Sequence, residues 1–200
     1  GAPHFIQIST DEVYGDIVDG KHKESDPLRP SNPYSATKAA ADMLLIGWAR
    51  TYGIRYNIVR MTNNYGQNQY PEKLIPKSAW RMRRGLPALM HGDGSYFRSW
   101  LHVEDSVEAI TTIMEKGETN AIYNVHGNCE LRNIEVLKKL ASALDVPENE
   151  AFLSIPNRVG QDVRYSLDDS KVRALGWMPR RNFDEELKKI AFEDDFKRFL

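Results

Sequence analysis

The sequence predicts an α/β fold built around a parallel sheet. Short runs rich in Val, Ile and Tyr alternate along the chain with longer stretches whose apolar residues recur at three- and four-residue spacing. Pro, Asp, Ser and Gly separate the two kinds of segment. Because strands that alternate with helices are typical of a parallel sheet covered by helices, this order gives the fold class.

The predicted elements follow in chain order. Strands rich in β-branched and aromatic residues cover residues 4–9 (HFIQIS), 55–61 (RYNIVRM) and 121–127 (AIYNVHG). The first helix begins at Pro33, whose fixed φ suits a first turn, with Ser31 or Asn32 as the cap, and it ends before Gly53. A short helix closed by Gly85 is expected over residues 71–85. Amphipathic helices are expected over residues 104–117, 132–146 and 183–200.

Composition excludes several classes of function. The 27 basic and 28 acidic residues give a net charge of −1, so the chain as a whole is not drawn to nucleic acid or to an anionic membrane. We expect no membrane span and no signal peptide, because no apolar run is long enough. The single cysteine, Cys129, excludes an internal disulfide and favours a reducing, cytoplasmic setting. No set of residues has metal-ligand spacing, so we predict no metal site.

Two adjacent carboxylates stand where the first predicted strand ends. Asp11 and Glu12 follow Ser9 and Thr10 directly. Like charges repel and neither residue favours a strand, so stability does not explain the pair. A solvated acidic loop is the simpler interpretation. The chemical one is that two carboxyls whose environments separate their pKa values act as a general acid and a general base.

A tyrosine and a lysine stand four residues apart on the first predicted helix. Tyr34 and Lys38, in PYSATKAAAD, therefore share one helix face. A tyrosine can accept the hydroxyl proton of a sugar carbinol during oxidation if a nearby cation stabilises its phenolate. A surface pair is the alternative, because this spacing also arises by chance. Its position after a strand that ends in Ser-Thr favours the chemical interpretation.

Together, STDEVYG and PYSATKAAAD resemble the extended short-chain dehydrogenase/reductases that act on nucleotide sugars. With NNYGQNQYPEKLIP, GDGSYFRSWLHVEDSVEAI and IYNVHG in order, the chain is similar to the dTDP-glucose 4,6-dehydratase family over nearly its whole length. The resemblance implies the C-terminal part of a Rossmann-type parallel sheet with a smaller α/β substrate-binding lobe. Residues 1–68 would belong to the NAD-binding half, and residues 69–200 mainly to the lobe, with some segments returning to the sheet.

The resemblance implies NAD as the cofactor and dehydration of a nucleoside-diphosphate glucose as the reaction. Once C4 of the sugar is oxidised, Glu12 would remove the C5 proton and Asp11 would protonate the departing C6 hydroxyl. Thr10 would hold the 4-hydroxyl beside Tyr34, the base of the oxidation, and Lys38 would stabilise the phenolate and bond the ribose. Reduction at C6 then leaves no net consumption of the cofactor.

The resemblance also implies a nucleotide-sugar site. In addition to Thr10, the expected substrate contacts are Asn63, Lys73, Leu74, Leu89, His91, Arg98, Asn133, Arg158, Gln161 and Tyr165, and Asn64 is expected on the cofactor side. The sequence departs from the family pattern at Ser99 and Val159, where Asp and Pro are usual. His91 stands in place of a tyrosine and Gln161 in place of a histidine. These departures leave the base open between thymine and uracil.

The glycine-rich loop that grips the NAD pyrophosphate in this family is missing. The only G-x-G is Gly92-Asp93-Gly94, and position 97 is Phe. We therefore expect the C-terminal part of a longer enzyme, which by itself would be inactive. One alternative is a binding module that holds a nucleotide sugar through Arg98 and Arg158. Another is a 4-epimerase, against which the acid pair argues.

An apolar stretch on the catalytic helix is expected to form part of the core and of a subunit contact. It comprises Met43, Leu44, Leu45, Ile46 and Trp48. In the family that the chain resembles, the corresponding helix lies at a dimer interface. A homodimer is therefore expected, with a nucleotide sugar as the small-molecule partner and neither nucleic acid nor membrane as a partner.

Overall fold

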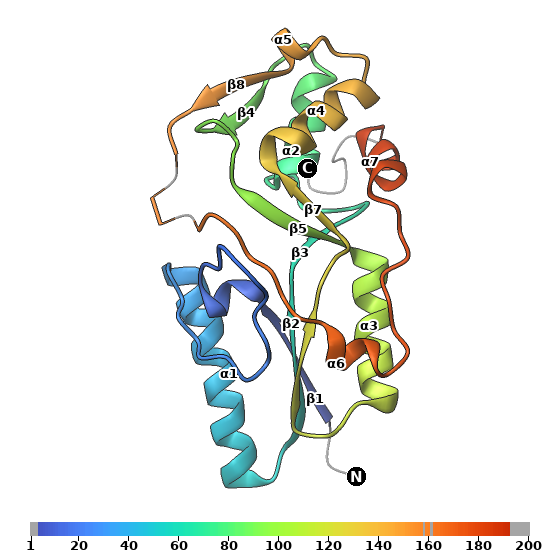
Figure 1. The fold of residues 1–200 in the computed structure, drawn as a ribbon. Helices are drawn as coiled ribbons and strands as arrows, with labels where there is room; N and C mark the ends of the chain where they lie inside the picture. The colour runs from blue at the N-terminus through green and yellow to red at the C-terminus, as the bar shows by residue number, and fades with distance from the viewer. Residues whose placement is uncertain (1–3, 158, 161, 193–200) are drawn as a thin grey trace.

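The computed structural model describes residues 4–157, 159–160 and 162–192 (Figure 1). One end of the molecule is a parallel sheet in the order β1-β2-β6, formed by β1 (His4–Thr10), β2 (Arg55–Met61) and β6 (Ala121–Val125). The helix α1 (Pro33–Tyr52) packs on one face, and α3 (Val103–Lys116) and α6 (Ser170–Arg173) pack on the other. Because both faces are covered, the side chains of β2 from position 56 onwards are buried. The predicted α/β fold with a parallel sheet is confirmed.

The other end of the molecule combines two small sheets with a layer of helices (Figure 1). In one sheet, β5 (Phe97–His102) pairs in parallel with β3 (Asn63–Tyr65) and antiparallel with β7 (Cys129–Arg132). In the other, β4 (Ala88–His91) pairs in parallel with β8 (Phe152–Ile155). The packed helices are α2 (Leu74–Met82), α4 (Asn133–Ala143) and α7 (Phe183–Ala191), and the short α5 (Glu148–Ala151) precedes β8. Ile75, Leu137 and Leu187 are buried in the core between the packed helices.

All of the predicted strands and helices form, with ends that differ by a few residues. The helix predicted over 71–85 is the shorter α2, and the one predicted over 183–200 is described only as far as residue 192. The sequence did not predict β3, β4, β7 and β8, or the short helices. These strands are three or four residues long and mix polar with apolar side chains. Their distant partners, more than their own preferences, hold them extended.

The helix α1 has the predicted limits. Asn32 is the cap, since its Oδ1 accepts a hydrogen bond from the Ser35 N–H at 2.9 Å, and Gly53 ends the helix with φ 70°. The buried face is narrow and consists of Ser35, Ala39 and Asp42. The side chains of Met43, Leu44 and Trp48 are 49%, 63% and 55% exposed. These three therefore lie outside the core of the described chain, contrary to that part of the expectation. Among the residues that the structure covers, no helix is long and apolar enough to cross a bilayer.

Candidate functional site

The two adjacent carboxylates lie in a single tight turn at the end of β1. Residues Asp11–Tyr14 form a 3-10 helix, η1, whose first free N–H, that of Glu12, donates to Thr10 Oγ1 at 3.3 Å. Gly15 ends this helix with φ 83°, and a Cβ there would lie 2.4 Å from the Arg29 carbonyl oxygen. Only glycine tolerates both conditions. The turn therefore holds Asp11 and Glu12 at a fixed place beside the carboxyl end of the sheet.

Asp11 is buried, with 3% of its surface exposed. Its Oδ1 accepts a hydrogen bond from Thr10 Oγ1 at 3.1 Å, and its Oδ2 has no hydrogen-bond partner among the described residues. Burial, and then the charge of Glu12, raise the pKa of Asp11 to about 7. A solvated acidic loop does not fit these observations. A carboxyl that keeps its proton near neutral pH is suited to general-acid chemistry.

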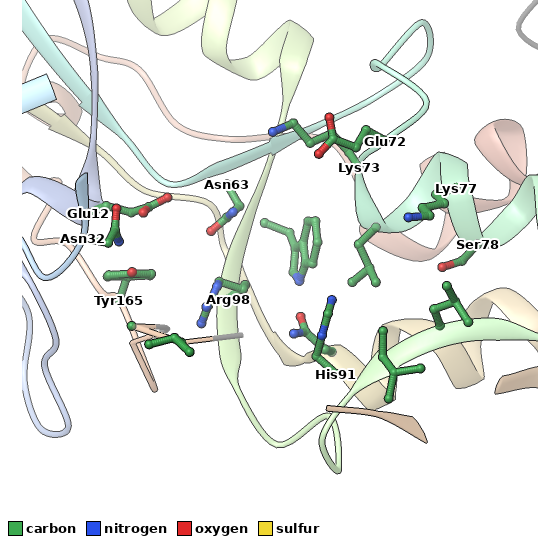
Figure 2. Close-up of a pocket in the computed structure, with 17 residues that line it drawn as sticks. Glu12, Asn32, Asn63, Glu72, Lys73, Lys77, Ser78, His91, Arg98 and Tyr165 are labelled. Carbon is green, nitrogen blue, oxygen red and sulfur yellow. The ribbon is translucent and has the colours of Figure 1, made fainter. Parts of the chain in front are cut away.

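Glu12 occupies a different environment, at the wall of a cavity. Burial raises the pKa of Glu12, whereas a side-chain hydrogen bond from Asn32 and the positive charge of Arg98 act to lower it. Figure 2 shows Asn32 beside Glu12 at one end of the cavity. Two neighbouring carboxyls therefore differ in exposure and in hydrogen bonding, the condition under which one can act as acid and the other as base.

Tyr34 and Lys38 lie on the side of α1 next to these carboxyls. Tyr34 is 55% exposed, and partial burial together with the charges of Glu12 and Asp11 raises the pKa of its phenol. Lys38 Nζ donates a hydrogen bond to the Ile8 carbonyl oxygen at 2.6 Å. The sequence analysis expected Lys38 to lower the pKa of the Tyr34 phenol. The structure shows a raised pKa, because the Lys38 ammonium is bonded to the strand and the charges of Glu12 and Asp11 act on the tyrosine.

A cavity of about 410 Å³ extends from Glu12 towards the helical end of the molecule (Figure 2). This volume is in the range of small-ligand sites. The predicted residues that line it are Glu12, Asn63, Lys73, Leu74, Leu89, His91, Arg98, Asn133 and Tyr165. The fold thus gathers nine positions spread over some 150 residues of sequence around one cavity.

Arg98 lies at the centre of the cavity wall, between Glu12 and His91 in Figure 2. Only 9% of its surface is exposed, its Nη1 donates to the Phe97 carbonyl oxygen at 2.6 Å, and its guanidinium lies 5.0 Å from the Tyr165 ring centroid. Lys73 adds a second cation where α2 begins, and a helix N-terminus attracts anions. The Oδ1 of Asn63 is buried without a partner among the described residues. This wall is suited to an anionic ligand that also carries hydroxyl groups.

Tyr165 and His91 are both held by hydrogen bonds at the cavity wall. The Tyr165 hydroxyl donates to Asp162 Oδ2 at 2.6 Å, and Ser31 donates to the same oxygen. Burial and the Asp162 bond raise the pKa of Tyr165. His91 Nδ1 lies 2.8 Å from the Pro156 carbonyl oxygen, so this nitrogen carries the proton.

Among the described residues, the predicted positions that do not line the cavity are Thr10, Asp11, Tyr34, Lys38 and Asn64. Both side-chain groups of Asn64 are engaged inside the protein, where Nδ2 donates to the Thr62 carbonyl oxygen at 3.0 Å and Oδ1 accepts from Ser106. Arg158 and Gln161 lie outside the described residues. In the part of the chain that the structure covers, no cluster of three or more His, Cys, Asp and Glu side chains could hold a metal.

Sequence reasoning missed several lining residues, among them Asn32, Lys77, Ser78 and Trp100. Asn32 was considered only as a helix cap, and it also lies against Glu12. Lys77 could have been found, because it follows Lys73 by one helical turn and so lies on the same face of α2. Ser78 and Trp100 carry no local signal that separates them from core positions.

Comparison with known proteins identifies the family of this chain. A sequence profile of the GDP-mannose 4,6 dehydratase family matches residues 2–190. The chain belongs to this family. It is 44% identical over 184 residues to the low-salt glycan biosynthesis protein Agl12 of Haloferax volcanii, with 92% of this chain and 59% of that protein covered. It is 43% identical to an Arabidopsis thaliana trifunctional UDP-glucose 4,6-dehydratase/UDP-4-keto-6-deoxy-D-glucose 3,5-epimerase/UDP-4-keto-L-rhamnose-reductase, with 92% of this chain and 28% of that protein covered.

A solved structure gives the same fold. The crystal structure of DesIV, a dTDP-glucose 4,6-dehydratase from Streptomyces venezuelae with NAD and TYD bound, superposes with a TM-score of 0.90 at 38% identity. The alignment covers 94% of this chain and 58% of that chain. The present chain therefore spans less than two thirds of the length of these relatives, while nearly all of it finds an equivalent in them.

Proposed function

We propose that the protein carrying this chain is a NAD-dependent nucleoside-diphosphate-glucose 4,6-dehydratase. The observation that supports it most strongly is the acid pair, one carboxyl buried with a pKa of about 7 and the next at the wall of a ligand-sized cavity. Elimination of water from a sugar needs an acid and a base at neighbouring carbons, which is what two such carboxyls supply.

The residues on the exposed side of α1 fit one end of the cofactor. The Tyr34 hydroxyl and the Lys38 ammonium are of the chemical kind that bonds ribose hydroxyls, and Tyr34 is exposed beside the acid pair whereas Lys38 is half-buried. NAD, when bound, supplies the oxidation at C4 and the reduction at C6. Tyr34 would accept the C4 hydroxyl proton, and Thr10 would hold that hydroxyl in place.

The elimination step is assigned to the acid pair. Glu12, ionised, would take the proton from C5, which is acidic once C4 is a ketone. Asp11, protonated, would donate its proton to the C6 hydroxyl, which leaves as water. The charges balance, because one carboxyl gains the proton that the other loses, and one water is released for each sugar.

The nucleotide would occupy the rest of the cavity. Arg98 and Lys73 would meet the diphosphate, where a guanidinium and an ammonium suit phosphate oxygens. His91 lies further along the cavity wall than Arg98 (Figure 2), Leu89 also lines the cavity, and the base is expected at these two residues. dTDP-glucose is the first candidate substrate and UDP-glucose the second.

A homodimer is part of this proposal. The exposed apolar side chains of α1, Met43, Leu44 and Trp48, would be covered by a second copy of the protein. Size-exclusion chromatography with light scattering measures the mass directly, and a monomer at working concentration would contradict the dimer alone.

Turnover in deuterated water tests the reaction. The protein that contains this chain is incubated with NAD and either dTDP-glucose or UDP-glucose, and the product is analysed by mass spectrometry and NMR. We expect loss of one water, a ketone at C4 and deuterium at C5, because Glu12 exchanges its proton with solvent. Tyr34→Phe should abolish the reaction at the oxidation step while substrate affinity stays within about threefold, since little contact area is removed.

Two other outcomes would decide against a dehydratase. A product with inverted C4 and no loss of water would identify a 4-epimerase. Binding of the nucleotide without any turnover would identify a binding module.

A further inference from the structure

A charged side chain of the sheet is buried and bonded to both α1 and η1. Arg60, on β2, is 1% exposed. Its Nε donates to Asp42 Oδ2 at 3.0 Å, its Nη1 donates to the Tyr14 hydroxyl at 2.8 Å, and its guanidinium lies 4.8 Å from the Tyr14 ring centroid. Removing a guanidinium from water is costly, so its presence here needs a reason.

The two partners of Arg60 belong to the two elements that carry the catalytic residues. Asp42 is on α1, one and two turns after Lys38 and Tyr34, and therefore on the same side of the helix. Tyr14 is the last residue of η1, which begins with the acid pair. One planar guanidinium thus bonds α1 with one nitrogen and η1 with another.

Other polar residues in the same row of the sheet complete the network. Ser9, Arg60 and Asn124 are partners in register across β1, β2 and β6. Ser9 Oγ donates to Asp42 Oδ2 at 3.0 Å, and the Tyr14 hydroxyl donates to Asn124 Oδ1 at 2.9 Å. The bonds run from α1 through the three strands to η1, and all of these groups are buried.

Stability alone does not account for this network. Replacing a buried ion pair by apolar residues of similar size is often neutral or stabilising. In this pair, Asp42 Oδ1 has no hydrogen-bond partner among the described residues, so the carboxylate is not fully compensated. Hydrogen bonds, unlike apolar contacts, fix direction and distance, and a misplacement of about 1 Å at a reacting group can lower a rate about 100-fold.

We infer that Arg60 is a positioning residue, which sets the place of the Tyr34–Lys38 side of α1 relative to the Asp11–Glu12 turn. The inference rests on the proposed function, since both groups would act on one sugar. Tyr34 and Lys38 act at C4 and the ribose, the acid pair acts at C5 and C6, and all must meet the same substrate.

The test separates positioning from folding. Arg60→Met alone leaves Asp42 buried without its partner and is expected to fold poorly. The informative variant is therefore Asp42→Leu with Arg60→Met, which removes both charges and keeps the volume. The matched control is Asp105→Leu with Arg181→Met, which removes a second ion pair built on a buried aspartate, joined at 2.7 Å, that lines a different cavity from Glu12. Thermal unfolding, kcat, KM and the NMR titration of labelled aspartate carboxyls are measured for each protein.

We expect the double variant to melt within a few degrees of the parent, with kcat lowered roughly 10- to 100-fold and KM changed less than about threefold. The Asp105→Leu, Arg181→Met control should keep the parent kcat whatever its melting temperature. A double variant with the parent's stability and kcat would overturn the inference, as would an equal loss of kcat in the control.

If the parent protein shows no turnover, the proposed function fails, and the titration of Asp11 decides the inference. Loosening η1 would admit water, so the pKa of Asp11 should fall from about 7 towards 4 in the double variant and stay unchanged in the control. An unchanged Asp11 pKa in the double variant would then overturn the positioning role.

Discussion

Replacing Asp11 by Asn should stabilise the protein at neutral and alkaline pH. The folded protein binds the Asp11 proton more tightly than the unfolded chain does, because burial raises the pKa of this carboxyl from 3.8 to about 7. The associated stability is fully present below the unfolded pKa and is lost as the pH rises through the folded one. Asn is neutral and nearly isosteric, so the variant escapes this loss.

The size of the effect follows from the pKa shift. A rise of about 3 units corresponds to about 4 kcal/mol of folding free energy between pH 4 and pH 8. Total stabilities of natural domains are about 5–15 kcal/mol, so the difference should be easy to detect. The Thr10 Oγ1 bond is to Oδ1, and an Asn side chain keeps this acceptor while its amide replaces the proton on Oδ2.

Urea unfolding at half-unit steps from pH 4 to pH 8.5 measures this prediction. The free energy of unfolding of Asp11→Asn minus that of the parent should rise with pH and level off above pH 7. Asp19→Asn, which removes an exposed carboxylate from the following loop, controls for the loss of one negative charge. Parallel curves for the parent and Asp11→Asn between pH 4 and pH 8 would refute the account of Asp11 as a buried, proton-holding carboxyl.

Three further outcomes are expected. Glu12→Gln should lower product formation at least about 100-fold and remove deuterium incorporation at C5, because elimination needs a base there; normal product formation would exclude this role. Asn32→Ala should lower the free energy of unfolding in urea by about 1 kcal/mol, because α1 loses its cap. It should also raise the pKa of Glu12 and so move the acidic limb of the pH profile of kcat/KM to higher pH; a limb that does not move would show that Asn32 does not act on Glu12. Burial lowers the pKa of His126 to about 4, so the folded state disfavours the charged imidazole. The free energy of unfolding should therefore fall by about 3 kcal/mol as the pH falls from 6.5 to 4. A His126→Gln variant that loses as much stability in acid as the parent would contradict this.

The sequence by itself determined the features that depend on local order. The i, i+4 spacing placed Tyr34 and Lys38 on one side of a helix, and the cap residues predicted both ends of that helix. The strand that ends in Ser-Thr placed Asp11 and Glu12 at the carboxyl edge of the sheet. Periodicity and chain order are enough for these, because an element's own geometry decides which of its residues share a face.

Only the tertiary structure decided what those residues face. The raised pKa of Asp11 comes from desolvation, which depends on how distant segments pack over it. The bond from Lys38 to the strand carbonyl and the side-chain contact of Asn32 with Glu12 are likewise invisible to any local pattern. So are the partners of Arg60, which in the sequence is one of three polar residues in its strand. Its partners lie 18 residues before it, on α1, and 46 residues before it, on η1. Periodicity specifies a face within one element, whereas the partner across the interior is selected by packing and by the need of every buried charge for a counter-charge.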